Sequence, residues 1–155
     1  MLPLALYQCC YLGSELLDGW TRKDKSVEYI SLEDVKRCFD ARITLAYRES
    51  FLVSRIFNVP VPLESCKSHR HCAPRITALG LASMREHPSL LIHALWEWSK
   101  FITTRERVCE GCVEVLCERD RAEHRRIWDA LPQIFGITIN GWGKPGGGES
   151  EGDVA

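Results

Sequence analysis

Two cysteine pairs near the middle of the chain carry the strongest chemical signal in the sequence. Cys66 and Cys72 are separated by five residues, and Cys109 and Cys112 by two. Thiolate sulfur and neutral imidazole nitrogen are the ligands that tetrahedral zinc selects, and a metal that joins distant segments can stabilise a small helical domain. We therefore expect Cys66, Cys72, Cys109 and Cys112 to be the ligands of one structural zinc ion.

Other interpretations of these residues stay open. The spacer of the first pair is longer than the usual two to about four residues, so His69 or His71 can replace one of the cysteines as a ligand. The same thiols can instead be reduced core side chains, or form a disulfide. Redox catalysis by Cys109 and Cys112 is disfavoured, because a thioredoxin-like motif needs a βαβ setting and this chain has a helical pattern.

The other four cysteines fall within expected helices, where cysteine is usually a core residue. They are Cys9, Cys10, Cys38 and Cys117. Cys117 is the one best placed to act as a further ligand, because it follows Cys112 by about one and a half helical turns.

No complete catalytic set is visible. Cys66 with His69 or His71 suggests a nucleophile and a base, but no pattern places an Asn or Asp to orient the base. His93 and His124 lie in expected helices without ligand-like neighbours. We therefore expect a non-enzymatic protein.

Composition limits the class of protein. The chain has 155 residues, with 20 Lys and Arg against 21 Asp and Glu, so no overall field attracts nucleic acid or an anionic membrane. Eight cysteines are too few for a secreted disulfide scaffold of this length.

The apolar N-terminus, residues 1–13, lacks the basic residues of a secretory signal, and residues 90–98 are too few to span a bilayer. We expect an intracellular protein, cytoplasmic or nuclear, with no membrane association.

Helical patterns occupy the first half of the chain. Residues 2–17 are apolar on nearly every face and predict a helix packed on several sides. Residues 20–30 are a charged connector, either a loop or one short irregular strand. Ser31, with Asp34 three residues on, predicts the start of a second helix that runs to about Phe57. Its buried face is expected to hold four side chains at helical spacing: Val35, Phe39, Ile43 and Ala46.

Three further helices are predicted beyond the first cysteine pair. Pro74 suits the first turn of a helix that continues through Met84. A fourth helix is expected over residues 91–98, and a fifth over residues 108–131, ending at Pro132. The prediction is a mainly α fold: one irregular domain of about five helices over residues 1–140, stapled by zinc. A disordered Gly/Glu-rich tail is expected over residues 141–155.

The fifth helix carries a dense run of alternating charges from Glu118 to Arg126. Mixed signs at helical spacing are typical of a solvated face with local ion pairs. The arginines of this run also allow an alternative function, a nucleic-acid-binding module that uses the helix Arg119–Arg126. The interspersed carboxylates make that alternative unfavourable.

Read from end to end, the chain resembles the region that follows the BTB/POZ domain in fungal BTB domain-containing proteins. The similar stretches are residues 2–10 (LPLALYQCC), 19–38 (GWTRKDKSVEYISLEDVKRC), 66–74 (CKSHRHCAP), 109–112 (CEGC) and 127–137 (IWDALPQIFGI). The resemblance implies a helical region whose paired cysteines are the two pairs described above. The BTB domain itself, an α/β dimerisation module that in some families recruits a cullin ligase, would precede Met1 and is absent from this sequence, so its role is not transferred.

We therefore expect a protein-interaction or scaffold domain with protein partners. The alternatives are the nucleic-acid-binding module and, less favoured, a thiol redox protein that depends on Cys109.

Overall fold

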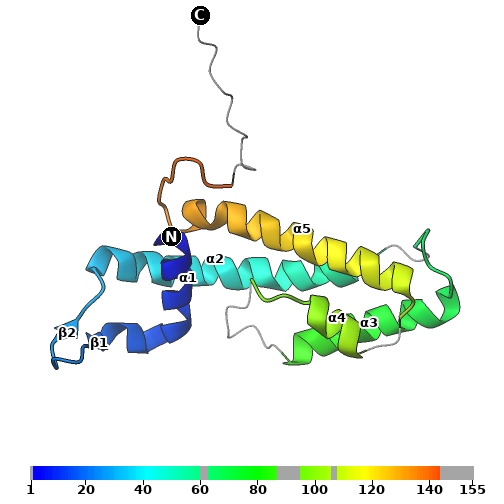
Figure 1. Cartoon of the computed structure of the whole chain (residues 1–155), viewed down its shortest axis with the longest axis horizontal. Helices are drawn as coiled ribbons and strands as arrows, with labels where there is room; N and C mark the ends of the chain where they lie inside the picture. Colours follow the sequence, from blue (N-terminus) through cyan, green and yellow to red (C-terminus); the bar gives the residue numbers. More distant parts are fainter. Residues whose placement is uncertain (1, 60–62, 87–94, 106–107, 144–155) are drawn as a thin grey trace, which may run out of the picture.

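The computed structural model describes residues 2–59, 63–86, 95–105 and 108–143, except for the side chains of residues 69 and 86 (Figure 1). Its elements follow one another as α1 (Leu2–Leu12), the 3-10 turn η1 (Gly13–Leu17), β1 (Trp20–Thr21), β2 (Val27–Glu28), α2 (Leu32–Phe57), α3 (His69–Glu86), α4 (Ser99–Arg105) and α5 (Glu110–Ile134). The predicted mainly α fold of about five helices is confirmed. Residues 144–155, the larger part of the expected tail, lie outside the described residues.

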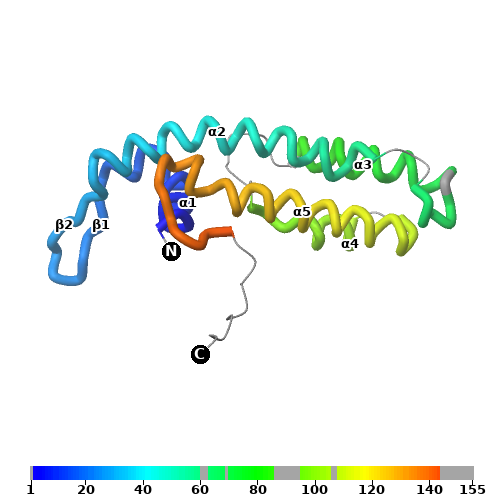
Figure 2. The backbone as a smooth tube through the Cα atoms, turned by 90° about the horizontal axis from the view of Figure 1, so that it is seen from above, coloured from blue at the N-terminus to red at the C-terminus, as the bar shows by residue number. Residues whose placement is uncertain are grey.

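Two long helices form the frame of the molecule. α2 and α5 run side by side in opposite directions, as Figures 1 and 2 both show. α1 packs on both of them near the start of α2, whereas α3 contacts α2 and α4 contacts α5 toward the other end. The core between these helices is aliphatic and aromatic, and includes the fully buried Leu45, Ile56, Trp98, Leu116 and Leu131. The frame therefore positions the N-termini of α3 and α5 at the end of the molecule away from α1 (Figure 1).

The start of α2 agrees with its sequence signal, but its buried face agrees with the prediction only in part. The hydroxyl of Ser31 accepts a hydrogen bond from the Asp34 backbone N–H at 3.1 Å, which caps the helix as predicted. Phe39 and Ile43, which were expected in the core, are 44% and 75% exposed. Val35 is buried as predicted, but the rest of the core row lies on a different side of the helix: Cys38, Ala41, Leu45, Leu52 and Ile56. α2 is apolar on two opposite faces, and periodicity alone does not show which one is covered.

Several boundaries also differ from the sequence prediction. α1 passes into a 3-10 turn at Gly13, and residues 20–30 form a two-stranded antiparallel hairpin in which Trp20 pairs with Glu28. α3 begins five residues before Pro74, because the Ser68 carbonyl accepts the backbone N–H groups of His71 and Cys72 and so starts the helix earlier.

The predicted fourth helix is wrong where it can be judged. Residues 91–94 lie outside the described residues, and residues 95–98 are not helical. α4 begins at Ser99 because the buried carboxylate of Asp120 accepts hydrogen bonds from the Ser99 backbone N–H at 2.9 Å and from its hydroxyl at 2.8 Å. That pairing satisfies one of the amide groups that a helix N-terminus leaves free.

α5 continues through Pro132 to Ile134, although proline was expected to end it. Pro132 has no N–H to offer the carbonyl of Trp128, one turn earlier. The indole Nε1–H of Trp142 donates to that carbonyl instead, at 2.8 Å, and the two tryptophan rings stack with centroids 4.7 Å apart. Packed side chains thus extend past residue 140.

No helix in the described ranges combines the length and the apolar character that crossing a membrane requires.

Candidate metal centre

The four predicted cysteine ligands come together at the end of the frame where α3 and α5 begin (Figure 1). Cys66 lies in the turn before α3, and Cys72 lies in the first turn of that helix. Cys109 is the N-cap residue of α5, and Cys112 lies in its first turn. Each helix N-terminus therefore contributes one pair of thiols.

The spacing of the sulfur atoms fits a single metal ion. The four Sγ atoms all lie within 4.8 Å of one another, and the Sγ atoms of Cys66 and Cys109 are 3.9 Å apart. Four thiolates around a tetrahedral ion at about 2.3 Å have sulfur atoms about 3.8 Å apart. All eight cysteines are free thiols, so the predicted alternative of a disulfide is not present in this structure. The four cysteines could bind a metal ion.

Backbone hydrogen bonds hold the two segments in place. The N–H groups of Cys112 and Val113 donate to the Cys109 carbonyl at 2.9 and 3.0 Å, and the Cys109 N–H donates to the Cys72 sulfur at 3.3 Å. The last of these bonds crosses directly from α5 to α3. It fixes the relative position of the two pairs before any metal is considered.

Gly111 is required by a close approach rather than by the shape of the turn. A Cβ atom at position 111 would lie 2.5 Å from the carbonyl oxygen of Ser65, which no real side chain tolerates. The Ser65 hydroxyl also donates to the Gly111 carbonyl at 3.2 Å. Glycine here lets the turn that carries Cys66 lie directly against the start of α5.

Three of the clustered thiols, those of Cys72, Cys109 and Cys112, have shifted pKa values. Burial raises the pKa of Cys109, but the backbone N–H groups of Cys112 and Lys67 and the neighbouring thiols outweigh it and lower the pKa to about 6. Burial and hydrogen bonds to the other thiols raise the pKa of Cys112. For Cys72 the hydrogen bond from the Cys109 N–H lowers the pKa, but burial and the hydrogen bonds to the Cys109 and Cys66 thiols outweigh it, so the pKa is raised overall. Cys109 thus becomes a thiolate at lower pH than Cys72 or Cys112.

The alternative ligands are not part of this cluster. The group that could hold a metal ion, as found among the described residues, contains no histidine, and His71 is exposed on α3. The side chain of His69 lies outside the described residues. Cys117, the suggested additional ligand, lies further along α5 and is not in the group either.

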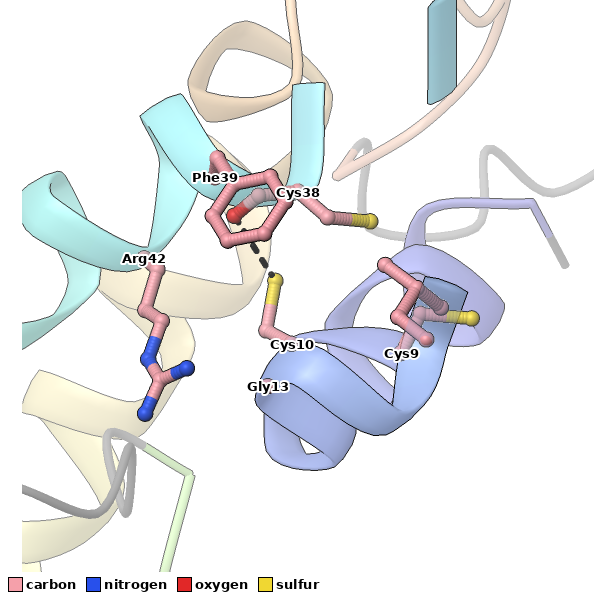
Figure 3. A pocket seen from close by; sticks show the side chains of 7 residues that line it. Cys9, Cys10, Gly13, Cys38, Phe39 and Arg42 are labelled. Carbon is pink, nitrogen blue, oxygen red and sulfur yellow. Dashed lines mark hydrogen bonds between the residues drawn. The ribbon is translucent and has the colours of Figure 1, made fainter. Parts of the chain in front are cut away.

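Three of the remaining thiols belong to the α1–α2 contact, shown in Figure 3. The thiol of Cys10 donates to the Cys38 carbonyl at 3.5 Å, and both side chains are buried, as their helical positions predicted. Burial raises the pKa of Cys10 to about 12. Cys9 lies beside them, and all three cysteines line a small pocket together with Gly13 and Arg42. These thiols contribute to the core.

The charged run of α5 is not simply a solvated face. Asp120 and Glu123 are buried, with Asp120 1% exposed. Asp120 faces His124 one turn later, with Asp120 Oδ1 3.2 Å from His124 Nδ1. The expectation that His124 has no ligand-like neighbour was therefore wrong. The spacing of four residues between Asp120 and His124 could have indicated this pair. Ser99 bonds to the carboxylate rather than to the imidazole, so the three residues do not form a nucleophile–base–acid relay.

Comparison with known proteins finds no matching family model, and neither a curated protein nor a solved structure matches the chain. The resemblance to the region after a BTB domain therefore stays a prediction.

Proposed function

We infer that this chain is a non-enzymatic protein-interaction or scaffold domain whose helical frame is held by a structural zinc ion. The observation that carries the proposal is the group of four cysteine sulfurs within 4.8 Å of one another, contributed by the N-termini of α3 and α5. Four protein thiolates fill a tetrahedral ion completely and leave no open position for a water or a substrate. A centre of this kind stabilises structure rather than performing chemistry.

Zinc is the metal that this donor set favours. Tetrahedral sites made of four thiolates hold zinc or iron, and zinc adds no redox chemistry to a site that joins two helices. Two helix N-termini directed at the site also favour the negative charge of bound thiolates. The proposal places the protein in a reducing compartment, the cytoplasm or the nucleus, where thiols persist.

Elemental analysis of protein purified without added metal tests the zinc centre. We expect close to one zinc per chain, with no visible absorption from iron, and loss of the zinc in Cys66→Ser and in Cys109→Ser. Cys117→Ser is the matched control, because this cysteine lies on the same helix outside the cluster, and it should keep its zinc. Protein without metal and with eight reactive thiols after denaturation would contradict the centre.

The interaction role is supported by the large apolar side chains that the fold leaves exposed, since a surface with contiguous apolar area usually contacts another protein. Cross-linking followed by mass spectrometry of the zinc-bound chain in an extract of its source cells tests this role. We expect reproducible protein cross-links that are fewer, but not lost, for the zinc-free Cys66→Ser/Cys109→Ser double variant, because the segments next to the cysteines loosen while the start of α2 keeps its structure. Cross-links that are equal for both proteins would contradict a zinc-dependent scaffold.

A thiol redox protein is the second candidate, because Cys109 combines a pKa lowered to about 6 with a neighbouring thiol at Cys112. Turnover of a disulfide substrate by metal-free protein, lost in Cys109→Ser but kept in Cys117→Ser, would favour it over the scaffold.

The nucleic-acid-binding alternative loses support from the contacts of the arginines on α5. Arg119 donates to the carbonyls of Arg55 and Asn58, Arg121 donates to the Cys117 carbonyl, and Arg126 pairs with Glu123 at 2.5 Å. These contacts within the protein compete with phosphate binding. A mobility shift with DNA or RNA that weakens steeply with salt would revive the alternative.

A further inference from the structure

The outer face of α2 exposes several large apolar side chains, with the charged Lys36 and Asp40 among them. Five large side chains along it are between 43% and 75% exposed: Leu32, Phe39, Ile43, Tyr47 and Phe51. We call these five residues the outer α2 face. The rings of Tyr47 and Phe51 contact each other edge to face, with centroids 4.8 Å apart, and so form a ready-made aromatic surface at one end of the face.

The outer α2 face lies opposite the side of the helix that enters the core. At about 100° per residue, its five side chains fall within an arc of about 120°, whereas the buried row centred on Leu45 and Leu52 points the other way. A helix that is apolar on two opposite sides normally packs against something on both. Within the described residues, the core covers only one of them.

Basic side chains border this face on the side of α5. A groove between α2 and α5 is lined by Tyr47, Phe51, Arg48, Arg55 and Arg126, together with Glu123 and the less polar side chains near them. Glu123 is the only carboxylate of this lining, and it already pairs with Arg55 at 3.1 Å and with Arg126 at 2.5 Å. Three arginines against one glutamate leave the groove positively charged beside an apolar stripe.

We propose that the outer α2 face and this groove bind an amphipathic helix of a protein partner, with apolar side chains on one face and carboxylates along the adjoining edge. The inference rests on the proposed function, because it names the surface and the partner class of the interaction domain. The partner's apolar side chains pack on Phe39, Ile43 and Tyr47. Its carboxylates meet Arg48 in particular, because Arg55 and Arg126 already pair with Glu123, and this contact sets the orientation of the bound helix.

Charge and shape favour a partner helix over two other possible occupants of this face, which are a second copy of the chain and a nucleic acid. A second copy of the chain would bring the same arginines toward one another, which is repulsive. A nucleic acid would bind the arginines through its phosphates and stack its bases on the two aromatic rings. It would make no favourable contact with the aliphatic Ile43, which is the most exposed member of the face.

Fluorescence anisotropy with a labelled synthetic peptide tests the proposal on the full zinc-bound chain. The probe is a helix of about five turns with leucines on one face and glutamates along the neighbouring edge, and its partner probe carries lysines in place of the glutamates. We expect saturable binding of the acidic peptide that is at least about tenfold tighter than that of the lysine peptide. Ile43→Glu and Arg48→Glu should each weaken it at least about tenfold.

Leu81→Glu is the matched control, because Leu81 is also an exposed leucine, 54% exposed, but lies on α3. It should bind the acidic peptide as the unmodified chain does. Zinc content and helical circular dichroism identify any variant that fails to fold, and the exposed Ile43 is a position where a charged side chain is tolerated.

Four results would overturn the inference. They are equal binding of the acidic and lysine peptides, unchanged binding by Ile43→Glu, self-association in sedimentation analysis that Ile43→Glu abolishes, and competition by an oligonucleotide for the same face. If the chain holds zinc and forms zinc-dependent cross-links but binds no acidic peptide, only this inference fails. If it holds no zinc and forms no cross-links, the proposed function has failed first.

Discussion

Gly111 controls how closely the two cysteine-bearing segments approach each other. Gly111→Ala would place a Cβ atom 2.5 Å from the Ser65 carbonyl oxygen, and because that atom belongs to the backbone, the whole turn must move. Overpacking of this kind costs about 1–3 kcal/mol, which corresponds to a fall in Tm of roughly 2–12 °C for a chain of this size. We expect that fall in thermal denaturation, together with weaker zinc binding in competition with a chelator.

Glu114→Ala is the control for this substitution, because Glu114 is exposed and lies on the same helix, three residues after Gly111. It should leave both measurements unchanged within error. A Gly111→Ala variant with unchanged Tm and zinc affinity would show that the turn accommodates a side chain without moving the cysteines.

Cys109 should be the reactive thiol once the metal is removed. Its pKa is lowered to about 6 by the backbone N–H groups of Cys112 and Lys67, against an ordinary value of 9.0. The thiolate therefore favours the folded state, a contribution that is fully present above the ordinary pKa and is lost as pH falls through about 6. Alkylation of chelator-treated protein by iodoacetamide, followed by peptide mass mapping, should show Cys109 modified with a midpoint near pH 6.

Cys10 is the internal reference for this experiment, since burial raises its pKa to about 12 and it should stay unmodified in the folded chain. If Cys109 reacts only as pH approaches the ordinary value of 9.0, the hydrogen bonds to its sulfur are not formed in the metal-free protein.

Among the elements, the last turn of α5 is stabilised by the side chain of Trp142, which lies beyond the end of the helix at Ile134. Trp142→Phe keeps a ring to stack on Trp128 but removes the Nε1–H that pairs with the carbonyl left free by Pro132. Losing this bond should cost about 1 kcal/mol in denaturant unfolding. In a Pro132→Ala background the same substitution should cost less, because an amide at position 132 can take the carbonyl instead.

The double-mutant cycle of Pro132→Ala and Trp142→Phe isolates this coupling. Additive effects would mean that the Trp142 indole stabilises α5 only by packing.

The sequence predicted the elements better than their edges and faces. The Ser31 cap and the two cysteine pairs depend on neighbouring residues, and both appear in the structure as expected. The continuation of α5 depends on Trp142, and the start of α4 depends on Asp120, contacts between residues far apart in the chain that no local pattern contains. The burial of Phe39 was mistaken for the same reason, because the partner that selects the inner face of α2 is the rest of the fold.

In the molecule as a whole, the cysteine cluster and the α1 contact lie at opposite ends of the α2–α5 frame (Figure 1). At the α1 end, the packing of α1 on α2 and α5 includes the buried Leu6, Tyr7 and Cys10 and contains none of the four clustered thiols. At the other end, α3 meets the start of α5 through the cysteines, the Cys109–Cys72 hydrogen bond and the Ser65–Gly111 contact. The two ends should therefore respond differently when the metal is removed.

Hydrogen exchange with and without a chelator measures this difference. We expect faster exchange in residues 66–76 and 109–116 after zinc removal, while residues 35–46 and 127–135 keep their protection, because local stability follows local contacts. At free zinc of about 100 times Kd, binding contributes about 2.7 kcal/mol, so removal should lower Tm by roughly 5–11 °C. Helical circular dichroism should fall only in part. Loss of protection across all four segments would mean that the metal supports the whole fold, and an unchanged pattern would mean that the four thiols hold the two helices together without it.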